Sequence, residues 1–203
     1  MTGEQLKCLL TYLELLVKWN KAYNLTAVRD PSQMVTRHLL DSLAIAPHLV
    51  GERLIDVGTG AGLPGVPMAI LFPQRHFSLL DSNGKKTRFL FQVKTQLGLD
   101  NMAVIQQRVE VSAPERPYDA VLSRAFASLE DMVNGCQHLL AAGGHFLAMK
   151  GGHPELELAV LADKCSVIAV HPLEVPGLAE QRHLVDMTLL RGADHSSTAT
   201  GIT

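Results

Sequence analysis

The sequence predicts an α/β fold built on a seven-stranded, mostly parallel sheet with helices on its faces. Two observations predict this class. From Arg53 onward, short apolar runs alternate with helical segments, and the first run ends in a glycine-rich turn that leads into a helix. A third observation concerns the last strand. Pro172, Pro176 and Gly177 fill the gap between the final two apolar runs, with no helical stretch, which favours an antiparallel return.

Two helices are expected before the sheet. Apolar residues recur at steps of three and four from Leu6 to Val17, which predicts a helix over about 4–21. Asp30, Pro31 and Gln33 then supply an N-cap, a proline at the first helical position and a capping-box glutamine. A second helix should therefore run from this point to about Ala46.

The remaining elements follow from the alternation of apolar runs and helical segments. The expected strands are 53–57, 76–81, 102–106, 118–123, 145–150, 166–171 and 183–190. The expected helices between them are 64–72, 85–97, 129–140 and 155–162. We therefore divide the chain into an N-terminal helical cap (1–50), a core (51–191) and a small, polar tail expected to be flexible (192–203), which together form one compact domain.

Composition narrows the class of protein further. Hydrophobic residues make up 47% of the 203 residues and charged residues 19%, as in globular chains with a buried core. There is neither an apolar run long enough to span a membrane nor a basic leader before an apolar stretch. Cys8, Cys136 and Cys165 lie far apart and form no C-x-x-C pair. We expect a cytoplasmic protein with no disulfide framework, no bound metal and no membrane partner.

The charge is unevenly distributed along the chain. The net charge is -2, yet residues 75–108 carry six Lys and Arg against two Asp and Glu, whereas residues 109–203 carry six against twelve. Proteins that bind nucleic acid through bulk charge are usually basic overall. Any contact with nucleic acid is therefore expected to be a local patch.

The turn after the first strand carries the strongest functional signal. It reads Asp56-Val57-Gly58-Thr59-Gly60-Ala61-Gly62-Leu63-Pro64-Gly65. Glycines at a strand-to-helix turn let the backbone approach a ligand where a Cβ would clash. A nucleotide-type ligand is expected at the carboxyl edge of the sheet, with Asp81, at the end of the second strand, in position to hold ribose hydroxyls.

Two cofactors remain compatible with this turn. Gly60, Gly62 and Gly65 fit the dinucleotide pattern G-x-G-x-x-G, whereas Asp56 and three of the glycines fit D-x-G-x-G-x-G. A carboxylate at the mouth of the first strand would oppose a pyrophosphate but suits a ligand with an ammonium group. Asp56 therefore favours a methyl donor such as S-adenosylmethionine over a nicotinamide cofactor.

The sequence also resembles a known family, the bacterial small-subunit ribosomal RNA guanine-N7 methyltransferases G, also called glucose-inhibited division protein B. The resemblance runs from Trp19 to about Val185. Its motifs are Lys18-Trp19-Asn20-Lys21-Ala22-Tyr23-Asn24-Leu25-Thr26, Arg37-His38-Leu39-Leu40-Asp41-Ser42, Asp56 to Gly65, Leu80-Asp81-Ser82, Arg108-Val109-Glu110, Ser123-Arg124-Ala125, Lys150-Gly151 and Arg182-His183-Leu184-Val185.

The resemblance implies a class I, Rossmann-like methyltransferase fold with an N-terminal helical cap. It implies S-adenosylmethionine as the methyl donor and N7 of one guanine in 16S ribosomal RNA as the acceptor, either in naked RNA or in the assembled particle. It further implies that Gly58 and Leu63 line the methionine end of the donor, that Val109 and Glu110 lie at the adenine, and that Arg124 reaches the cofactor site. With Gly60 and Asp81, these residues form the expected cofactor set.

The residue types agree with transfer to a ring nitrogen. Guanine N7 is a lone-pair nucleophile without a proton, so no general base is required. Ser123 and Arg124 follow the fourth strand, where amino-group methyltransferases resemble one another in carrying an Asn/Asp-Pro-Pro-aromatic clamp. Arg124 cannot hold N7 by a hydrogen bond while N7 attacks, so we expect it to contact the cofactor carboxylate or a phosphate.

Further residues are candidates for catalysis or for RNA contact. His38, three residues before Asp41, is a catalytic candidate beside Arg124, although ordering of two helices by this pair is the favoured interpretation. The candidates for RNA contact are Asn24, Arg37, Lys85, Lys86, Arg88, Lys150 and Arg182. A solvated helix face is the alternative for the three cations of 85–88. The protein is expected to act as a monomer.

Overall fold

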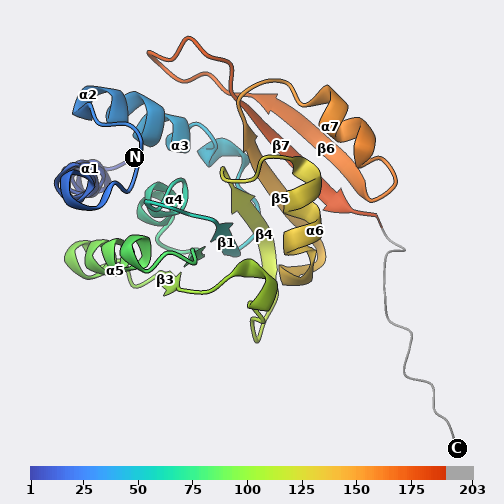
Figure 1. The fold of residues 1–203 in the computed structure, drawn as a ribbon, viewed down its shortest axis with the longest axis horizontal. Helices are drawn as coiled ribbons and strands as arrows, with labels where there is room; N and C mark the ends of the chain where they lie inside the picture. The colour runs from blue at the N-terminus through green and yellow to red at the C-terminus, as the bar shows by residue number, and fades with distance from the viewer. Residues whose placement is uncertain (191–203) are drawn as a thin grey trace, which may run out of the picture.

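The computed structural model describes residues 1–190 and contains one seven-stranded sheet of order β3-β2-β1-β4-β5-β7-β6. The first five strands pair in parallel, and β7 pairs antiparallel with both β5 and β6 (Figure 1). The predicted class, including the antiparallel last strand, is confirmed. Within the described residues, no helix is both long and apolar enough to cross a membrane.

The strands match the predicted ranges closely. They are β1 Arg53–Val57, β2 His76–Leu80, β3 Met102–Ile105, β4 Tyr118–Ser123, β5 Leu140–Lys150, β6 Cys165–Pro172 and β7 His183–Leu189. The largest difference is the start of β5, which was expected at His145. The strand begins earlier because Leu140 already pairs with Tyr118, before an irregularity shifts the register to Ala120 opposite His145.

The helices also lie where the sequence places them, with small differences at their ends. They are α1 Gly3–Tyr23, α2 Pro31–Met34, α3 Asp41–Leu43, α4 Gly65–Leu71, α5 Gly84–Leu97, α6 Leu129–Cys136 and α7 Glu155–Val160. Short 3-10 turns cover Ala46–His48, Val109–Val111 and Gln137–Leu139. A capping box of Thr2 and Gln5 begins α1, and Asn24, in the left-handed region, ends it.

The second predicted helix is not a regular α-helix. A π-helical segment, Val35–Leu40, separates α2 from α3, and the amide of Asp41 reaches back to the carbonyl oxygen of Thr36. Such wide turns are rare and often occur at functional sites. Here the turn places Arg37, His38 and Asp41 on the wall of one pocket.

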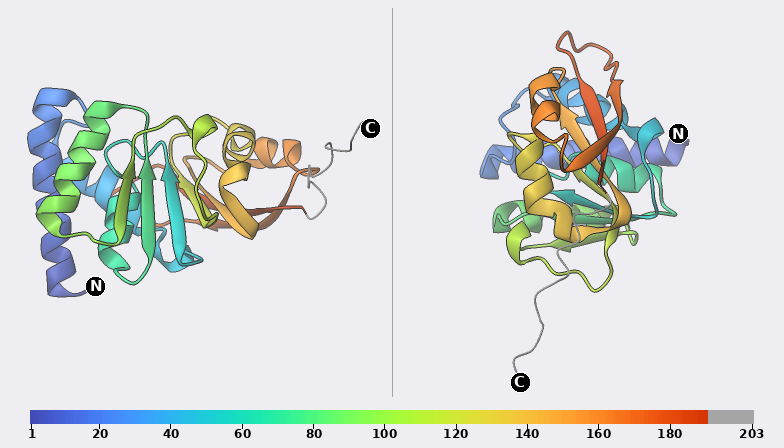
Figure 2. Two further views of the ribbon diagram at one scale, coloured as in Figure 1. Left: turned by 90° about the horizontal axis from the view of Figure 1, so that it is seen from below. Right: turned by 90° about the vertical axis from the view of Figure 1, so that its right-hand side faces the viewer.

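Helices cover both faces of the sheet. One hydrophobic cluster packs α1, α4 and α5 against one face and includes Leu16, Phe77 and Phe89. The other packs α6 and part of α7 against the opposite face and includes Val121 and Met132. Figure 2 shows α1 and α5 side by side at one end of the sheet. Residues of α1 share the first cluster with residues of the strands, and the predicted tail, residues 192–203, lies outside the described range.

Candidate functional site

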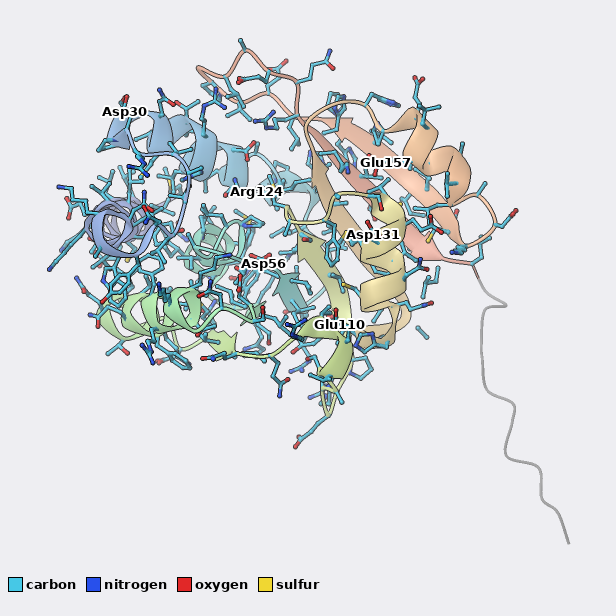
Figure 3. The ribbon with its side chains drawn as sticks, viewed as in Figure 1. Asp30, Asp56, Glu110, Arg124, Asp131 and Glu157 are labelled. Atoms are coloured by element: carbon cyan, nitrogen blue, oxygen red, sulfur yellow. The ribbon has the colours of Figure 1, made fainter. Side chains whose placement is uncertain are left out.

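The glycine-rich turn lies between β1 and α4, and hydrogen bonds to the Asp56 side chain fix its conformation. One carboxylate oxygen, Oδ2, accepts hydrogen bonds from Thr59 Oγ1 at 2.6 Å and from the Gly65 amide at 2.8 Å. The side chain is buried, and burial raises the pKa of Asp56 to about 6, although both hydrogen bonds oppose the shift. Asp56 was expected to face an ammonium group of the ligand. Instead it points into the turn and lines none of the pockets described below (Figure 3).

Asp81, directly after β2, fastens the turn to the next loop. Its Oδ2 accepts a hydrogen bond from the Gly60 amide at 2.9 Å, and its Oδ1 accepts one from the Asn83 amide at 2.8 Å. The Lys86 ammonium lies 3.4 Å from Oδ2. Lys86, predicted to contact RNA, thus lies beside the glycine turn.

Two neighbouring pockets share Gly58 and Ala125 in their walls. The loop pocket, about 190 Å³, is lined by Leu25, Thr26, Gly58, Thr59, Gly60, Ala61, Leu63, Arg124 and Ala125. The β2 pocket, about 240 Å³, is lined by Val57, Gly58, Leu80, Asp81, Ser82, Gln107, Arg108, Val109, Glu110, Ala125 and Phe126. Because both are bounded by Gly58 and Ala125, they lie side by side along the carboxyl edge of β1, β2 and β4, and we refer to the pair as the elongated cavity.

Gly58 lies in the wall between the two pockets, close to Ala125. It has φ +67, and a Cβ built on it would lie 2.8 Å from Cβ of Ala125. Glycine adopts this left-handed backbone conformation without strain, and it has no Cβ to clash with Ala125. The elongated cavity suits a nucleoside that carries an amino-acid tail, with the sugar near Asp81 and the tail near Arg124.

Arg124 is positioned by the turn that follows β4. The Ser123 hydroxyl donates to the Val57 carbonyl oxygen at 2.8 Å and accepts from the Ala125 amide at 3.1 Å. Arg124 Nη1 then donates to Asp41 Oδ2 at 3.1 Å. In Figure 3, Arg124 lies between the helical segment of residues 31–43 and Asp56. The guanidinium therefore faces away from the sheet and toward the cap.

A third pocket, the cap pocket, adjoins the loop pocket through Arg124. It measures about 360 Å³ and is lined by Val28, Arg37, His38, Asp41, Arg124, Met149, Lys150, Gly151, Leu173, Arg182 and His183. The pocket lies between the π-helical segment and the ends of β5 and β7. Its lining combines basic side chains with apolar ones, as expected for a site that takes a nucleotide.

His38 and Asp41 were expected to act as a pair but bond to different partners. His38 Nε2 lies 2.7 Å from Thr26 Oγ1, while Asp41 accepts hydrogen bonds from Arg124 and Arg182. Burial is the main cause that lowers the pKa of His38, so its imidazole is neutral near pH 7. His38 thus connects the cap helices to the loop after α1.

The structure brings most of the predicted site residues together. Gly58, Gly60, Leu63, Asp81, Val109, Glu110 and Arg124 line the elongated cavity, and Arg37, His38, Lys150 and Arg182 line the cap pocket with Arg124. Lys85 and Arg88 lie on the exposed side of α5. Asn24 lines none of these pockets, and its left-handed conformation ends α1.

Sequence reasoning assigned no ligand role to Thr26, and it considered Asp41 and His183 only as neighbours of His38 and Arg182; all three line these pockets. Their one signal was membership of quoted motifs, because all three lie within segments that carry the family resemblance. Nor did the sequence indicate that Lys150 is already bonded. Its ammonium lies 2.9 Å from Glu157 and donates to the Ala127 carbonyl oxygen at 3.0 Å.

The fold, the glycine turn and the acid after β2 define a class I methyltransferase. Solved structures agree on the fold. The glycopeptide N-methyltransferase MtfA is similar with a TM-score of 0.64 and 12% identity over 79% of this chain and 100% of that chain. TrmN from Thermus thermophilus gives a TM-score of 0.57 and 19% identity over 73% of this chain and 47% of that chain.

The family is shown by sequence. The family model described as rRNA small subunit methyltransferase G matches residues 5–185. Relatives of that name from Saccharophagus degradans and Pseudomonas paraeruginosa are each 58% identical, covering 93% and 91% of this chain and 85% and 87% of theirs. One from Escherichia fergusonii is 55% identical over 91% of this chain and 89% of its own. The chain belongs to the rRNA small subunit methyltransferase G family.

Proposed function

We propose that this protein transfers a methyl group from S-adenosylmethionine to N7 of a guanine in small-subunit ribosomal RNA, as a cytoplasmic monomer. The observation that carries the proposal is the junction at Arg124, where a cavity shaped for a nucleoside with an amino-acid tail opens beside a second, basic pocket. Membership of the methyltransferase family supports both the donor and the class of acceptor.

The residues of the elongated cavity fit this donor. Asp81 offers a carboxylate for ribose hydroxyls, and Val109 and Glu110 border the space for the adenine ring. Gly58 and Leu63 border the methionine end, and Arg124 lines the same pocket on the side that faces the cap. The bound sulfonium supplies an electrophilic methyl group and leaves as a neutral thioether.

Methyl transfer to guanine N7 requires the protein mainly to position the two reactants. The lone pair of guanine N7 would form the new N–C bond as the S–C bond of the donor breaks. The electron pair of the S–C bond would stay on sulfur. The positive charge passes to the guanine, and no proton has to move. Catalysis then depends on alignment of the two reactants and exclusion of water. We assign Arg124 and His38 to the walls that align the base, not to acid-base steps.

RNA contact is assigned to the cations around this site. Arg37 and Arg182 border the cap pocket, and Lys85 and Arg88 lie on the exposed side of α5. Lys86 joins them beside Asp81, and Asn24 lies next to the Leu25 that lines the loop pocket. Lys150, bonded to Glu157, is assigned to holding the loop after β4.

The experiment measures donor binding and methyl transfer in turn. Calorimetry should show that S-adenosylmethionine binds and that NADH does not; the reverse result would support the dinucleotide alternative. Labelled methyl should then pass to small-subunit RNA or particles taken from cells that lack this protein. Donor binding without transfer to either form would refute the assigned acceptor and leave the cofactor site standing.

A further inference from the structure

Positive charge in the cap pocket is concentrated at one place. Four cationic side chains line the pocket, and two of them already have a carboxylate of their own. Arg37 lies 2.6 Å from Glu180, and Lys150 lies 2.9 Å from Glu157. The remaining two, Arg124 and Arg182, share Asp41, which leaves one positive charge without a partner among the described residues.

The geometry of this group, which we call the arginine fork (Asp41, Arg124 and Arg182), is specific. Arg124 Nη1 donates to Asp41 Oδ2 and Arg182 Nε donates to Asp41 Oδ1, both at 3.1 Å. The Asp41 side chain is only 3% exposed, while those of Arg124 and Arg182 are 29% and 22% exposed. One buried carboxylate thus binds both guanidiniums, offsets their mutual repulsion and leaves both accessible from the pocket.

Two buried histidines give independent support for a ligand. His38 and His183 are 6% and 9% exposed and line the same pocket. The Nδ1 atom of each is buried and has no hydrogen-bond partner within residues 1–190. Buried polar atoms are nearly always paired, so two unpaired ring nitrogens in the wall of one pocket mark it as a site whose hydrogen bonding is incomplete in the free protein.

We propose that Asp41 is a positioning residue that holds Arg124 and Arg182 as a fork for one phosphate of the RNA strand that carries the acceptor guanine. His183 lines the same pocket as the fork, and Met149 and Leu173 form the apolar part of the pocket around it. This inference rests on the proposed function, because it names the part of the ribosomal RNA that the cap pocket grips.

For the effect of Asp41→Asn on RNA affinity, the proposal predicts the opposite sign from the one that net charge alone predicts. If only net charge mattered, removing the negative charge of Asp41 would tighten RNA binding. If Asp41 positions the fork, Asp41→Asn lets the two guanidiniums repel each other and separate, which weakens binding. Each lost phosphate contact also lowers the slope of log affinity against log salt by about 0.7 for single strands and 0.9 for duplexes.

The test measures binding of the full chain to small-subunit RNA by filter binding across a salt series. We expect Asp41→Asn to weaken affinity about tenfold and to lower the salt slope as much as Arg182→Gln does. The double variant should show no further loss of slope. The proposal is overturned if Asp41→Asn binds RNA at least as tightly as the parent and its salt slope is unchanged.

A matched control separates positioning from general loss of a buried acid. Asp186 is 6% exposed and bonded to His145 at 2.7 Å, but lines none of the three pockets. Asp186→Asn should keep the parent's affinity and slope. If Asp41→Asn does not fold, the test uses variants of Arg182. The proposal is overturned if Arg182→Gln keeps the salt slope of the parent, or if Arg182→Lys binds RNA with the full affinity of the parent.

Binding and transfer are measured on the same protein samples, so the two ideas fail separately. A parent protein that transfers no methyl group refutes the proposed function, whereas the salt series still tests the arginine fork. A parent that methylates RNA while the fork variants bind RNA like the parent refutes the fork alone.

Discussion

The hydroxyl of Tyr12 in α1 donates a 2.8 Å hydrogen bond to the carbonyl oxygen of Ala61 in the glycine turn. Tyr12 is fully buried and packs beside Phe89 of α5, with ring centroids 6.2 Å apart. The first helix therefore holds the turn that forms the loop pocket. This contact explains how a cap outside the sheet takes part in building the cofactor cavity.

Tyr12→Phe should destabilise the protein and loosen the turn. The substitution leaves the buried Ala61 carbonyl unpaired, which costs about 1–3 kcal/mol of the free energy of unfolding. We expect donor affinity, measured by calorimetry, to fall several-fold as well. Tyr118→Phe is the control, because Tyr118 begins β4 and does not bond to the glycine turn. If both variants bind the donor like the parent, α1 does not support the turn.

Gly58→Ala should abolish donor binding. The new Cβ would stand 2.8 Å from Cβ of Ala125 and close the junction of the two pockets. Gly98→Ala is a close control because Gly98 also has positive φ, +64, but nothing lies within 4 Å of its built Cβ. Both variants should lose about 1 kcal/mol of stability for the left-handed backbone. Unchanged donor binding by Gly58→Ala would refute the placement of the donor.

Asp56 should make stability depend on pH in an unusual direction. Burial raises its pKa to about 6 from the ordinary 3.8, so the folded state binds the proton more tightly than the unfolded state. The resulting stabilisation is fully present below pH 3.8 and is lost as the pH rises through about 6.

The measurement compares the parent with Asp56→Asn, which cannot titrate at this position. Across that range the free energy of unfolding of the parent, relative to the variant, should fall by about 3 kcal/mol. Chemical denaturation at a series of pH values gives this difference. A parent that instead gains stability over the variant with rising pH would show that the Asp56 carboxyl is stabilised in its ionised form.

Lys150→Met should affect stability more than RNA binding. The ammonium holds Glu157 and the Ala127 carbonyl oxygen, and Glu157 in turn accepts from the amide of Leu129 at 2.7 Å. Loss of the two bonds of the ammonium, of which the one to Glu157 is partly buried, should cost about 1–3 kcal/mol. We expect a lower melting temperature with an unchanged salt slope for RNA binding. A reduced slope with unchanged melting would instead make Lys150 a phosphate contact.

Local patterns in the sequence predicted the elements well and their long-range contacts poorly. The ranges of β1 and β4 were predicted to the residue, because their apolar runs end at clear turn signals. The early start of β5 escaped prediction because Ala141, Ala142, Gly143 and Gly144 show neither alternation nor strand propensity. The π-helical segment likewise has no periodic signature of its own.

For the site, the sequence predicted the residues but not their partners. The glycine turn and Asp81 are adjacent to strand ends, so their meeting at one sheet edge follows from parallel topology. The arginine fork joins residues 83 and 141 positions apart, and Tyr12 reaches Ala61 across 49. Such pairings depend on packing between elements. Local spacing does not encode which carboxylate a given arginine meets.

The most direct test of the proposed reaction is nucleoside analysis of RNA labelled by the purified protein. Small-subunit RNA or particles from cells that lack this protein receive labelled methyl from S-adenosylmethionine, and the RNA is then digested to nucleosides. We predict that the label appears in 7-methylguanosine. Label in a ribose-methylated nucleoside or in a base methylated on carbon or on an exocyclic amine would contradict transfer to guanine N7.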